Sequence, residues 1–396
     1  MTEDEISECL AACDSNKKTV AIRGGGTLEG IGFPVQADES VSTRGLNRIT
    51  EDTPSDSTVT VQSGVTLRTL SNALAMHGSH VPFDAPRPDS ATVGGTLAAG
   101  WLGPRRHIYG RARDFFFGST AILADGTVAG AGGTLAENVS GYDMSRLYVG
   151  SFGTLCVLAR ANLKTVPAPS DARLFLARLP EMTRSRAIAQ MRLLPVPPSA
   201  AFWIDGFHKA IDGDDGAQGR MFVFLEGSSD AIDGSTRDLR SALGRAGVPE
   251  TRIIDAEARA AFERVIDAYI ACVGERSITY RLATVPEDGE QAVLDTKELA
   301  ARFELRVDAI LDAMNGDAIV RVSDLNAHAL ASKMHMFDDA LHDAQPTAIV
   351  IAGDHPNRPT LRVWGELPPA FHAMQVLKAR FDPNGTLNPG RFVRGI

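Results

Sequence analysis

The sequence predicts an α+β protein built from two domains, and two observations support this. A chain of 396 residues is longer than one hydrophobic core usually supports. Glycine is unevenly distributed, because residues 24–153 hold 21 of the 37 glycines, whereas the chain after Pro167 alternates helix-period stretches with short apolar runs. Dense aperiodic glycine is typical of tight turns and close backbone approaches. Strand–helix alternation is typical of helices layered on a sheet.

The first part is predicted to contain short strands and helices between glycine-rich loops. A helix is expected over residues 66–76, because Leu67, Leu70 and Leu74 fall on one face, with Thr66 as the N-cap and Gly78 near the end. A further helix is expected over 4–14. Alternating or continuous apolar runs predict strands at 19–22, 57–61, 117–123 and 155–163.

The second part begins after the sequence PAPSD at 167–171, which indicates a domain boundary. Strands are expected at 220–225, 278–283, 318–323 and 347–352, and helices at 228–246, 256–271, 290–304, 326–342 and 367–380. This order predicts helices packed against a sheet.

Composition excludes several classes of protein. The net charge of −9 and the pI near 5.5 argue against a broad nucleic-acid surface. The sequence contains no run of about 20 apolar residues that would span a membrane, and it lacks the features of a secretion signal. We therefore expect a cytoplasmic protein. The four cysteines form no CxxC pair, so neither a metal site nor an iron–sulfur cluster is expected.

Three glycines follow the first predicted strand, in the order Arg23-Gly24-Gly25-Gly26-Thr27. Successive backbone N–H groups without Cβ atoms can converge on one anion, which suits a pyrophosphate. A tight turn between two strands would use the same residues. The triplet alone leaves both interpretations open.

A second stretch of small residues runs from Ala91 to Gly100 and contains Thr92, Gly94 and Gly95. Such a stretch would let a planar ring system or another backbone approach closely, or it would form the packing face of a helix. Glycines and hydroxyls recur at Gly150, Ser151 and Gly153, and two turns are expected around NPGRF, which includes Asn388.

Common alternatives lack their minimum motif. Gly24 and Gly26 would need a glycine at position 29 for GxGxxG, but this residue is Glu29. No lysine follows a glycine as in GxxxxGK[ST], and HExxH and GxSxG are absent.

The ordered set of motifs is more specific than any one of them. RGGGT, TLxxLxxxLxxHG, ATVGGxxAxG, GPRxxxYG, GYDxxRLxxGSxGTL and NPGRF occur in this order. The sequence resembles the FAD-linked oxidases of the vanillyl-alcohol oxidase type, which carry a PCMH-type flavin domain, and within them the glycolate oxidase FAD-binding subunits. The resemblance is strong over about 19–167 and moderate over about 367–393.

The resemblance implies a PCMH-type FAD-binding domain of two α/β subdomains with an inserted α/β substrate or cap domain. The expected boundaries are 1–170 for the FAD domain, 171–349 for the cap and 350–396 for a segment that returns to the FAD domain. By similarity, the FAD-binding residues would be Arg23, Gly24, Gly25, Gly26, Thr27, Thr92, Gly94, Gly95, Gly150, Ser151, Gly153 and Asn388.

Thr27 stands where several covalent relatives carry a histidine bonded to the flavin, so we expect non-covalent FAD. The HxGDGNxH stretch of relatives that work alone is replaced here by residues 350–358, without paired histidines, and Glu137 replaces the usual lysine. Both differences suit a subunit that works beside a homologous flavin subunit. The resemblance also implies an iron–sulfur subunit, which would hold the complex at the inner face of the membrane.

The implied reaction is oxidation of glycolate or a similar 2-hydroxy acid by hydride transfer to FAD. His355 is a candidate base, and Arg281 and Arg321 are candidates for holding the substrate carboxylate; a solvated histidine and salt-bridged arginines are the alternatives. A stand-alone FAD dehydrogenase for D-lactate or another alcohol, a non-catalytic flavin-binding assembly subunit and an FAD-free relic of the fold remain open.

Overall fold

The computed structural model describes residues 1–133, 143–207, 211, 219–248, 251–271, 277–324, 330–353 and 360–396. The chain forms two compact units. Unit 1 comprises residues 1–103, 110–168 and 367–396, and unit 2 comprises residues 104–109 and 169–366. Helices and strands are mixed in both, which confirms the predicted α+β class.

Unit 1 is built on a five-stranded antiparallel sheet of order β3-β4-β8-β6-β7. Strands β1 and β2, which come earlier in the chain, form a separate two-stranded parallel sheet. In β4, buried Val59 and Val61 alternate with partly exposed residues, which is the pattern that predicted this strand. The strands are β1 (Val20–Arg23), β2 (Glu39–Ser42), β3 (Ile49–Thr53), β4 (Thr58–Gln62), β5 (Ser79–His80), β6 (Phe116–Ile122), β7 (Val128–Gly132), β8 (Val157–Lys164) and β9 (Val166–Pro167).

The helices of unit 1 close its hydrophobic core. Ile6 and Leu10 of α1 pack in one cluster with Val20 of β1 and with Leu387, which comes from the C-terminal segment. Thr66 caps α2 by accepting a hydrogen bond from the Thr69 N–H, as the sequence predicted. The helices are α1 (Glu3–Ser15), α2 (Leu67–Ala75), α3 (Val93–Ala99), α5 (Ala112–Phe115), α6 (Met144–Tyr148) and α13 (Phe371–Phe381).

Unit 2 contains an eight-stranded sheet of order β13-β10-β12-β11-β15-β16-β14-β17. All of its strand pairs are antiparallel, although strand–helix alternation in sequence is also typical of parallel sheets. Its elements are α4 (Arg106–Tyr109), β10 (Asp171–Arg178), α7 (Glu181–Arg192), β11 (Ala200–Asp205), β12 (Arg220–Gly227), α9 (Ser229–Ala246), β13 (Thr251–Ile254), α10 (Ala258–Ala268), β14 (Ser277–Leu282), α11 (Gly289–Arg302), β15 (Leu305–Asp312), β16 (Ala318–Asp324), α12 (Leu330–Ala344) and β17 (Ile349–Gly353).

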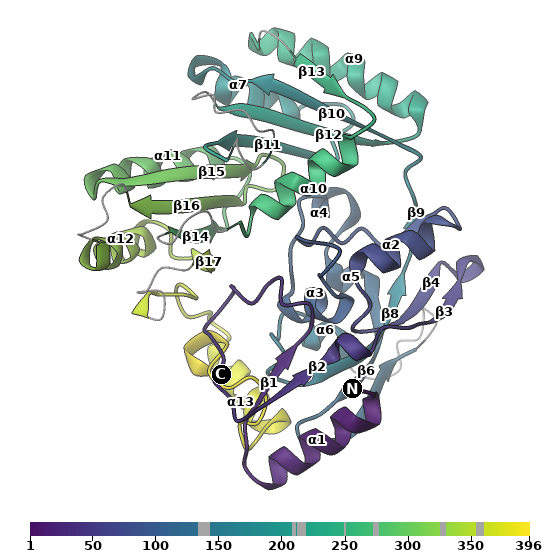
Figure 1. The fold of residues 1–396 in the computed structure, drawn as a ribbon. Helices are drawn as coiled ribbons and strands as arrows, with labels where there is room; N and C mark the ends of the chain where they lie inside the picture. The colour runs from purple at the N-terminus through teal and green to yellow at the C-terminus, as the bar shows by residue number, and fades with distance from the viewer. Residues whose placement is uncertain are drawn as a thin grey trace. The chain divides into compact units, whose positions relative to one another are not determined.

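The two faces of this sheet have different coverings (Figure 1). Arg173 of β10 reaches Asp233 and Thr236 of α9, and Tyr280 of β14 packs against Phe337 of α12, so these helices cover one face. On the opposite face, Phe224 of β12 stacks on Phe262 of α10 at a centroid distance of 4.4 Å. Because β17 pairs with β14, residues 350–353 belong to unit 2, and the chain rejoins unit 1 at Leu367.

A short piece of chain between two parts of unit 1 belongs to unit 2. Arg105 binds Glu226 at 2.9 and 3.0 Å, and Arg106 binds Asp317 at 2.6 Å. The GPRxxxYG motif therefore supplies α4 and two arginines to unit 2. Across the residues that the structure covers, no helix has both the length and the apolar character needed to cross a membrane.

Candidate functional site

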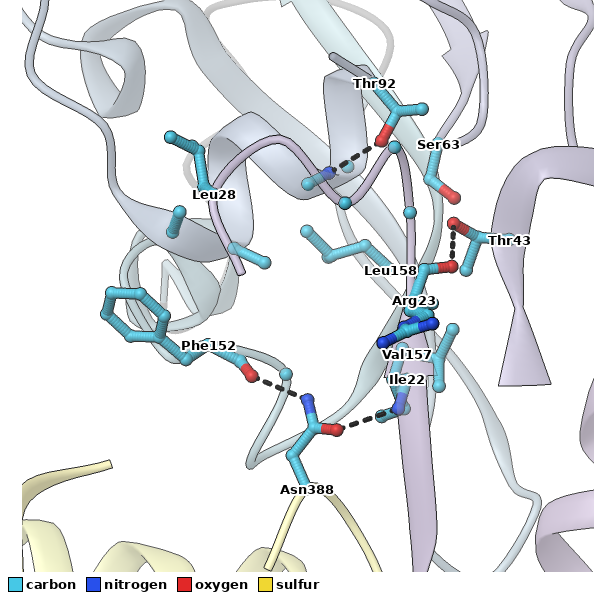
Figure 2. A pocket seen from close by; sticks show the side chains of 18 of the residues that line it. Ile22, Arg23, Leu28, Thr43, Ser63, Thr92, Phe152, Val157, Leu158 and Asn388 are labelled. Carbon is cyan, nitrogen blue, oxygen red and sulfur yellow. Dashed lines mark hydrogen bonds between the residues drawn. The ribbon is translucent and has the colours of Figure 1, made fainter. Parts of the chain in front are cut away.

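A cleft lies within unit 1 (Figure 2). Three glycine-rich segments and the C-terminal segment form its walls. Of the residues that the sequence predicted for FAD, the cleft is lined by Arg23, Gly24, Gly25, Gly26, Thr27, Thr92, Gly94, Gly95, Gly153 and Asn388. Gly150 and Ser151 are not among its lining residues.

The glycine loop after β1 presents unused backbone donors. No acceptor in the described parts of the chain takes the N–H of any residue from Gly24 to Leu28. Five successive N–H groups without partners form a concave, partly positive surface. The loop can therefore bind an anionic group that carries several acceptor oxygens.

Each glycine in this loop has its own structural reason. A Cβ atom on Gly25 would lie 1.8 Å from the Ser90 carbonyl oxygen, and one on Gly24 would lie 2.5 Å from the Thr92 hydroxyl oxygen. Gly26 has room for a Cβ atom, but its φ of +76° favours glycine. The loop is thus pressed against the segment that precedes α3, so both interpretations of the triplet, tight turn and anion nest, apply.

The stretch of small residues at 91–100 forms α3, and Thr92 is its N-cap. The Thr92 hydroxyl accepts a hydrogen bond from the Gly95 N–H at 3.2 Å. A Cβ atom on Gly94 would lie 2.5 Å from the Ser63 Cβ atom, so Gly94 lets α3 approach the end of β4. A Cβ atom on Gly95 would meet only the Thr92 hydroxyl oxygen, at 3.0 Å, so Gly95 leaves the cleft open at this point.

Asn388 holds two walls of the cleft together (Figure 2). Its side-chain oxygen accepts from the Ile22 N–H, and its side-chain nitrogen donates to the Phe152 carbonyl, each at 2.7 Å. The Asn388 N–H donates to the Val20 carbonyl at 2.9 Å. With these bonds and a φ of +40°, Asn388 positions β1 and the loop at Phe152.

Gly150 and Gly153 have different positions in the loop before β8. The Gly150 N–H donates to the Leu97 carbonyl, and Gly150 lies close to Gly100 at the end of α3. It supports α3 from outside the cleft. Gly153 has a φ of +70°, and a Cβ atom there would lie 2.7 Å from the Asn388 side-chain nitrogen.

Two cleft residues carry polar atoms that the sequence motifs did not reveal. Ser63 is 1% exposed, and its hydroxyl has no hydrogen-bond partner. Cys156 is also buried, which raises the pKa of its thiol far above the ordinary value. Neither lies in a glycine motif, so only the fold places them in this wall.

Charged side chains surround the mouth of the cleft. Arg44 donates to the Gly25 carbonyl at 3.1 Å, and Arg391 donates to the Leu28 carbonyl at 3.4 Å. Arg23 is exposed and forms an ion pair with Glu29 at 2.5 Å. Arg391, which lies in the NPGRF motif, also stands 5.8 Å from the centre of the Phe152 ring.

The candidate substrate residues lie in unit 2. Arg281 binds Asp317 at 2.6 Å, and Arg321 binds Asp308, with its Nε at 3.2 Å from the carboxylate. Both arginines are therefore ion-paired strand residues. His355 lies outside the residues that the structure describes. Within the described ranges, no group of three or more His, Cys, Asp or Glu side chains is arranged to hold a metal ion.

The cleft fits the FAD that the sequence resemblance implies. The unused N–H groups of residues 24–28 suit a pyrophosphate, and the unpartnered Ser63 hydroxyl lies in the same wall. A buried hydroxyl without a partner costs free energy unless a bound group or water completes it. The cleft is also lined by Ile22, Leu28, Phe152, Val157 and Leu158, and this apolar part of the lining suits a planar ring system.

Comparison with known proteins supports FAD as the cofactor. Residues 1–132 match the family model of the FAD binding domain. The chain is 26% identical to glycolate oxidase subunit GlcD of Bacillus subtilis (98% of this chain, 86% of the relative) and 28% identical to glycolate oxidase subunit GlcE of Escherichia coli (95% and 93%). It is 27% identical to D-lactate dehydrogenase of Archaeoglobus fulgidus (99% and 90%).

A solved structure has a similar fold. The p-cresol methylhydroxylase structure with bound substrate aligns with a TM-score of 0.75 at 16% identity, over 98% of this chain and 87% of the other. The likeness shows the fold, which is the PCMH type that the motifs predicted. The FAD binding domain match and the relatives over the full length then fix the cofactor as FAD. Residues 1–132 therefore carry an FAD binding domain, and the chain is similar over nearly its full length to glycolate oxidase subunits and to a D-lactate dehydrogenase.

Proposed function

We propose that this chain is the FAD-binding subunit of an oxidase or dehydrogenase for glycolate or a similar 2-hydroxy acid. The observation that carries the proposal is the run of five unused N–H groups after β1, in a cleft that also holds the Ser63 hydroxyl. Full-length similarity to two glycolate oxidase subunits supports the substrate class.

In this proposal, the chain's own residues bind and orient the cofactor. The amides of residues 24–28 bind the pyrophosphate, and Ser63 donates one further hydrogen bond. Thr92 and Asn388 have their side chains engaged by the protein, so they position the walls of the cleft. Bound FAD supplies the acceptor for the hydride that leaves the substrate.

We also propose that the FAD is not covalently attached. Thr27 lines the cleft at the position where covalent relatives carry histidine, and a threonine hydroxyl does not form that bond. Denaturation in acid followed by gel filtration should separate all flavin from the polypeptide. Flavin that stays with the chain would contradict this part of the proposal.

The proposal places substrate recognition in unit 2. Arg281 and Arg321 are the candidates for holding a carboxylate, and His355 is the proposed proton acceptor. In this proposal unit 1 is the flavin domain and unit 2 is the cap, so the segment that returns to the flavin domain begins at residue 367 and not at 350, and residues 104–109 belong to the cap.

Electrons must leave the reduced flavin, and the described residues offer no metal cluster of this chain for that purpose. We therefore propose a partner assembly of a homologous flavin subunit and an iron–sulfur subunit, in the cytoplasm at the inner face of the membrane. Affinity purification of the tagged chain from its source, followed by mass spectrometry, tests this assembly.

The test of catalysis uses the purified full chain loaded with FAD. Anaerobic mixing with glycolate should bleach the flavin absorbance if the chain oxidises 2-hydroxy acids by itself. Bleaching by D-lactate and not by glycolate would favour a stand-alone D-lactate dehydrogenase, which the similarity to the Archaeoglobus fulgidus enzyme supports. An unchanged spectrum with both acids would favour a non-catalytic flavin-binding subunit.

A further inference from the structure

Lys378 of α13 places an ammonium group in the interior of unit 1. Its side chain is 14% exposed, whereas lysine side chains are mostly exposed in folded proteins. Burial lowers the pKa of Lys378, although Asp382 acts in the opposite direction. A buried ammonium carries a desolvation cost, so this position in the fold requires an explanation.

All three donors of this ammonium are used by the protein. The Lys378 Nζ donates to the Thr154 carbonyl at 2.9 Å, to the Leu387 carbonyl at 3.0 Å and to the Asp382 carboxylate at 2.6 Å. An ammonium has three N–H groups and no acceptor. Asp382 also accepts from the Thr386 and Leu387 N–H groups, each at 2.8 Å, so satisfying this carboxylate alone does not require the lysine.

The two carbonyl acceptors lie next to residues of the FAD cleft. Thr154 follows Gly153, and Leu387 precedes Asn388; both Gly153 and Asn388 line the cleft. Lys378 is not among the lining residues. It therefore binds the backbone of two cleft walls from outside the lining.

Asn388 and Lys378 fix the same loop at two points. The Asn388 side-chain nitrogen donates to the Phe152 carbonyl (Figure 2), and two residues further along the loop the Thr154 carbonyl accepts from Lys378. Gly153 lies between these two contacts, and a Cβ atom there would stand 2.7 Å from the Asn388 side-chain nitrogen. The separation between this loop and the C-terminal segment is thus set twice.

The segment that Lys378 and Asp382 hold also holds β1. The Val20 N–H donates to the Thr386 carbonyl at 2.7 Å, and the Val20 carbonyl accepts from the Asn388 N–H at 2.9 Å. Strand β1 leads directly into residues 24–28, whose N–H groups suit a pyrophosphate. A displacement of the C-terminal segment would therefore reach those donors through β1.

We propose that Lys378 is a positioning residue for FAD binding. Its ammonium holds the loop at Thr154 and the segment at Leu387 at the separation that the bound cofactor requires. A neutral side chain of similar length would leave two buried carbonyls without this donor and Asp382 without its counter-charge, so the walls would lose their spacing and FAD would bind weakly.

The test compares the FAD affinity of the wild-type apoprotein, K378M and K18M by fluorescence titration of the full chain. K378M should bind FAD at least about tenfold more weakly. K18M is the matched control, because it makes the same substitution in unit 1 and removes a 3.0 Å ion pair with Glu39 that is half exposed. Its FAD affinity should stay within about twofold of the wild-type value. Wild-type affinity in K378M would overturn the assignment.

A pH profile distinguishes the ammonium from a side chain that only fills space. More than half of the Lys378 groups should be neutral at pH 10.5, the ordinary pKa of lysine, because burial lowers the pKa of this one. The ratio of wild-type to K378M affinity should therefore fall by at least about twofold between pH 7.5 and pH 10.5. A constant ratio would show that the charge does not act and would overturn the proposal.

Other titratable groups lie on α13, on the C-terminal segment and on the elements around them: Cys9, Cys13 and Asp14 of α1, Tyr148 of α6, Cys156 before β8, and Asp382. These groups and the flavin are the same in both proteins, so their titration cancels in the ratio.

A second measurement uses only the wild type and does not depend on the folding of K378M. Because linkage is reciprocal, FAD must stabilise the Lys378 contacts to the extent that these contacts stabilise bound FAD. Acetic anhydride should therefore acetylate Lys378 at least about threefold more slowly with FAD bound, whereas the exposed Lys18 should react equally in both forms. Peptide mass spectrometry measures both rates, and equal rates for Lys378 would overturn the proposal.

No substrate is present in these measurements, so they are independent of the acid that reduces the flavin. Weak FAD binding by K378M, in a protein whose flavin no 2-hydroxy acid bleaches, would keep Lys378 as a positioning residue and reject the proposed oxidation. Wild-type FAD affinity in K378M, in a protein whose flavin glycolate bleaches, would do the reverse.

Discussion

The cleft of unit 1 and one side of strands β14 to β16 in unit 2, which we call the polar face, both contain hydrogen-bond donors without acceptors, but the donors differ in kind. In the cleft they are backbone N–H groups of consecutive residues, 24–28. On the polar face they are side chains of Ser277, Thr279 and Arg321, which lie on different strands. The consecutive N–H groups of the cleft suit an anion with several acceptor oxygens.

This difference decides how much each site depends on local sequence. Consecutive N–H groups converge only where the backbone can turn sharply and pack closely, so the cleft requires glycines within a few residues of each other. The polar face requires only that β14 and β16 pair in the correct register. A single backbone change should therefore destroy the first site, whereas the second should tolerate single side-chain changes with graded losses.

The largest effect is expected from Gly25→Ala. The new Cβ atom would stand 1.8 Å from the Ser90 carbonyl oxygen, so the loop must move away from the segment that precedes α3. We expect a loss of about 3–5 kcal/mol in the free energy of unfolding and purified protein with little FAD. Urea unfolding and flavin absorbance per protein measure the two effects.

Gly130→Ala is the matched control for this change. Gly130 lies on β7 of the same unit, and a Cβ atom there would meet nothing within 4 Å. The free energy of unfolding of this variant should stay within about 0.5 kcal/mol of the wild-type value, and the variant should bind a full complement of FAD. Equal behaviour of the two alanine variants would mean that the loop does not depend on its close approach to Ser90.

Asn388→Ala should have the next largest effect. It removes two 2.7 Å hydrogen bonds, takes away the acceptor of the Ile22 N–H, and places alanine at a φ of +40°. The expected loss is about 3 kcal/mol in the free energy of unfolding, with weaker FAD binding. Unchanged FAD affinity in a folded variant would show that Asn388 does not position the cleft.

The sequence predicted the cleft better than the polar face, and particular residues show why. Gly24–Gly26 and Thr92 lie in contiguous motifs that impose their local geometry, and the Thr66 and Thr92 positions precede helices that they cap. Ser63 carries no motif, because its burial depends on Gly94 approaching it from another segment. The role of Asn388 also depends on a partner far away in sequence, since Leu387 pairs with Val20.

Unit 2 shows the same limit at the level of the fold. Strand–helix alternation predicted helices against a sheet, but the strands β10, β11 and β15 were not distinguished in the sequence, and the antiparallel order follows from long-range pairing. Arg281 and Arg321 are two similar strand arginines in sequence. Only the strand register and the positions of Asp308 and Asp317 distinguish them: Arg321 keeps a buried nitrogen without a hydrogen-bond partner, whereas Arg281 binds Asp317.

The third prediction concerns a carboxyl group of the polar face. Burial raises the pKa of Asp312 from 3.8 to about 7, although Arg106 and Asn315 act in the opposite direction. A raised folded-state pKa means that the native state binds a proton between about pH 4 and pH 7, so this group stabilises the fold at low pH. That contribution is lost as pH rises toward and through 7.

Asp312→Asn should remove this pH dependence. Relative to the variant, the wild type should lose about 2–3 kcal/mol of unfolding free energy between pH 5 and pH 8. Urea unfolding of both proteins at the two pH values gives the difference directly. A constant difference across this range would show that Asp312 titrates near its ordinary pKa, and the polar face would then be less shielded from water than we infer.

The smallest effect is expected from Ser63→Ala, which sharpens the comparison because Ser63 is a side-chain donor inside the backbone-built cleft. Its hydroxyl has no partner in the protein, so the FAD-free variant should be as stable as the wild type, while FAD should bind roughly fivefold more weakly.

Ser119→Ala is the control, because the Ser119 hydroxyl contacts the Ser145 hydroxyl at 3.1 Å in the interior. That variant should lose about 1 kcal/mol of stability with unchanged intrinsic FAD affinity. Fluorescence titration of FAD and urea unfolding separate the two patterns, and equal FAD affinity of S63A and wild type would assign recognition in the cleft to the backbone alone.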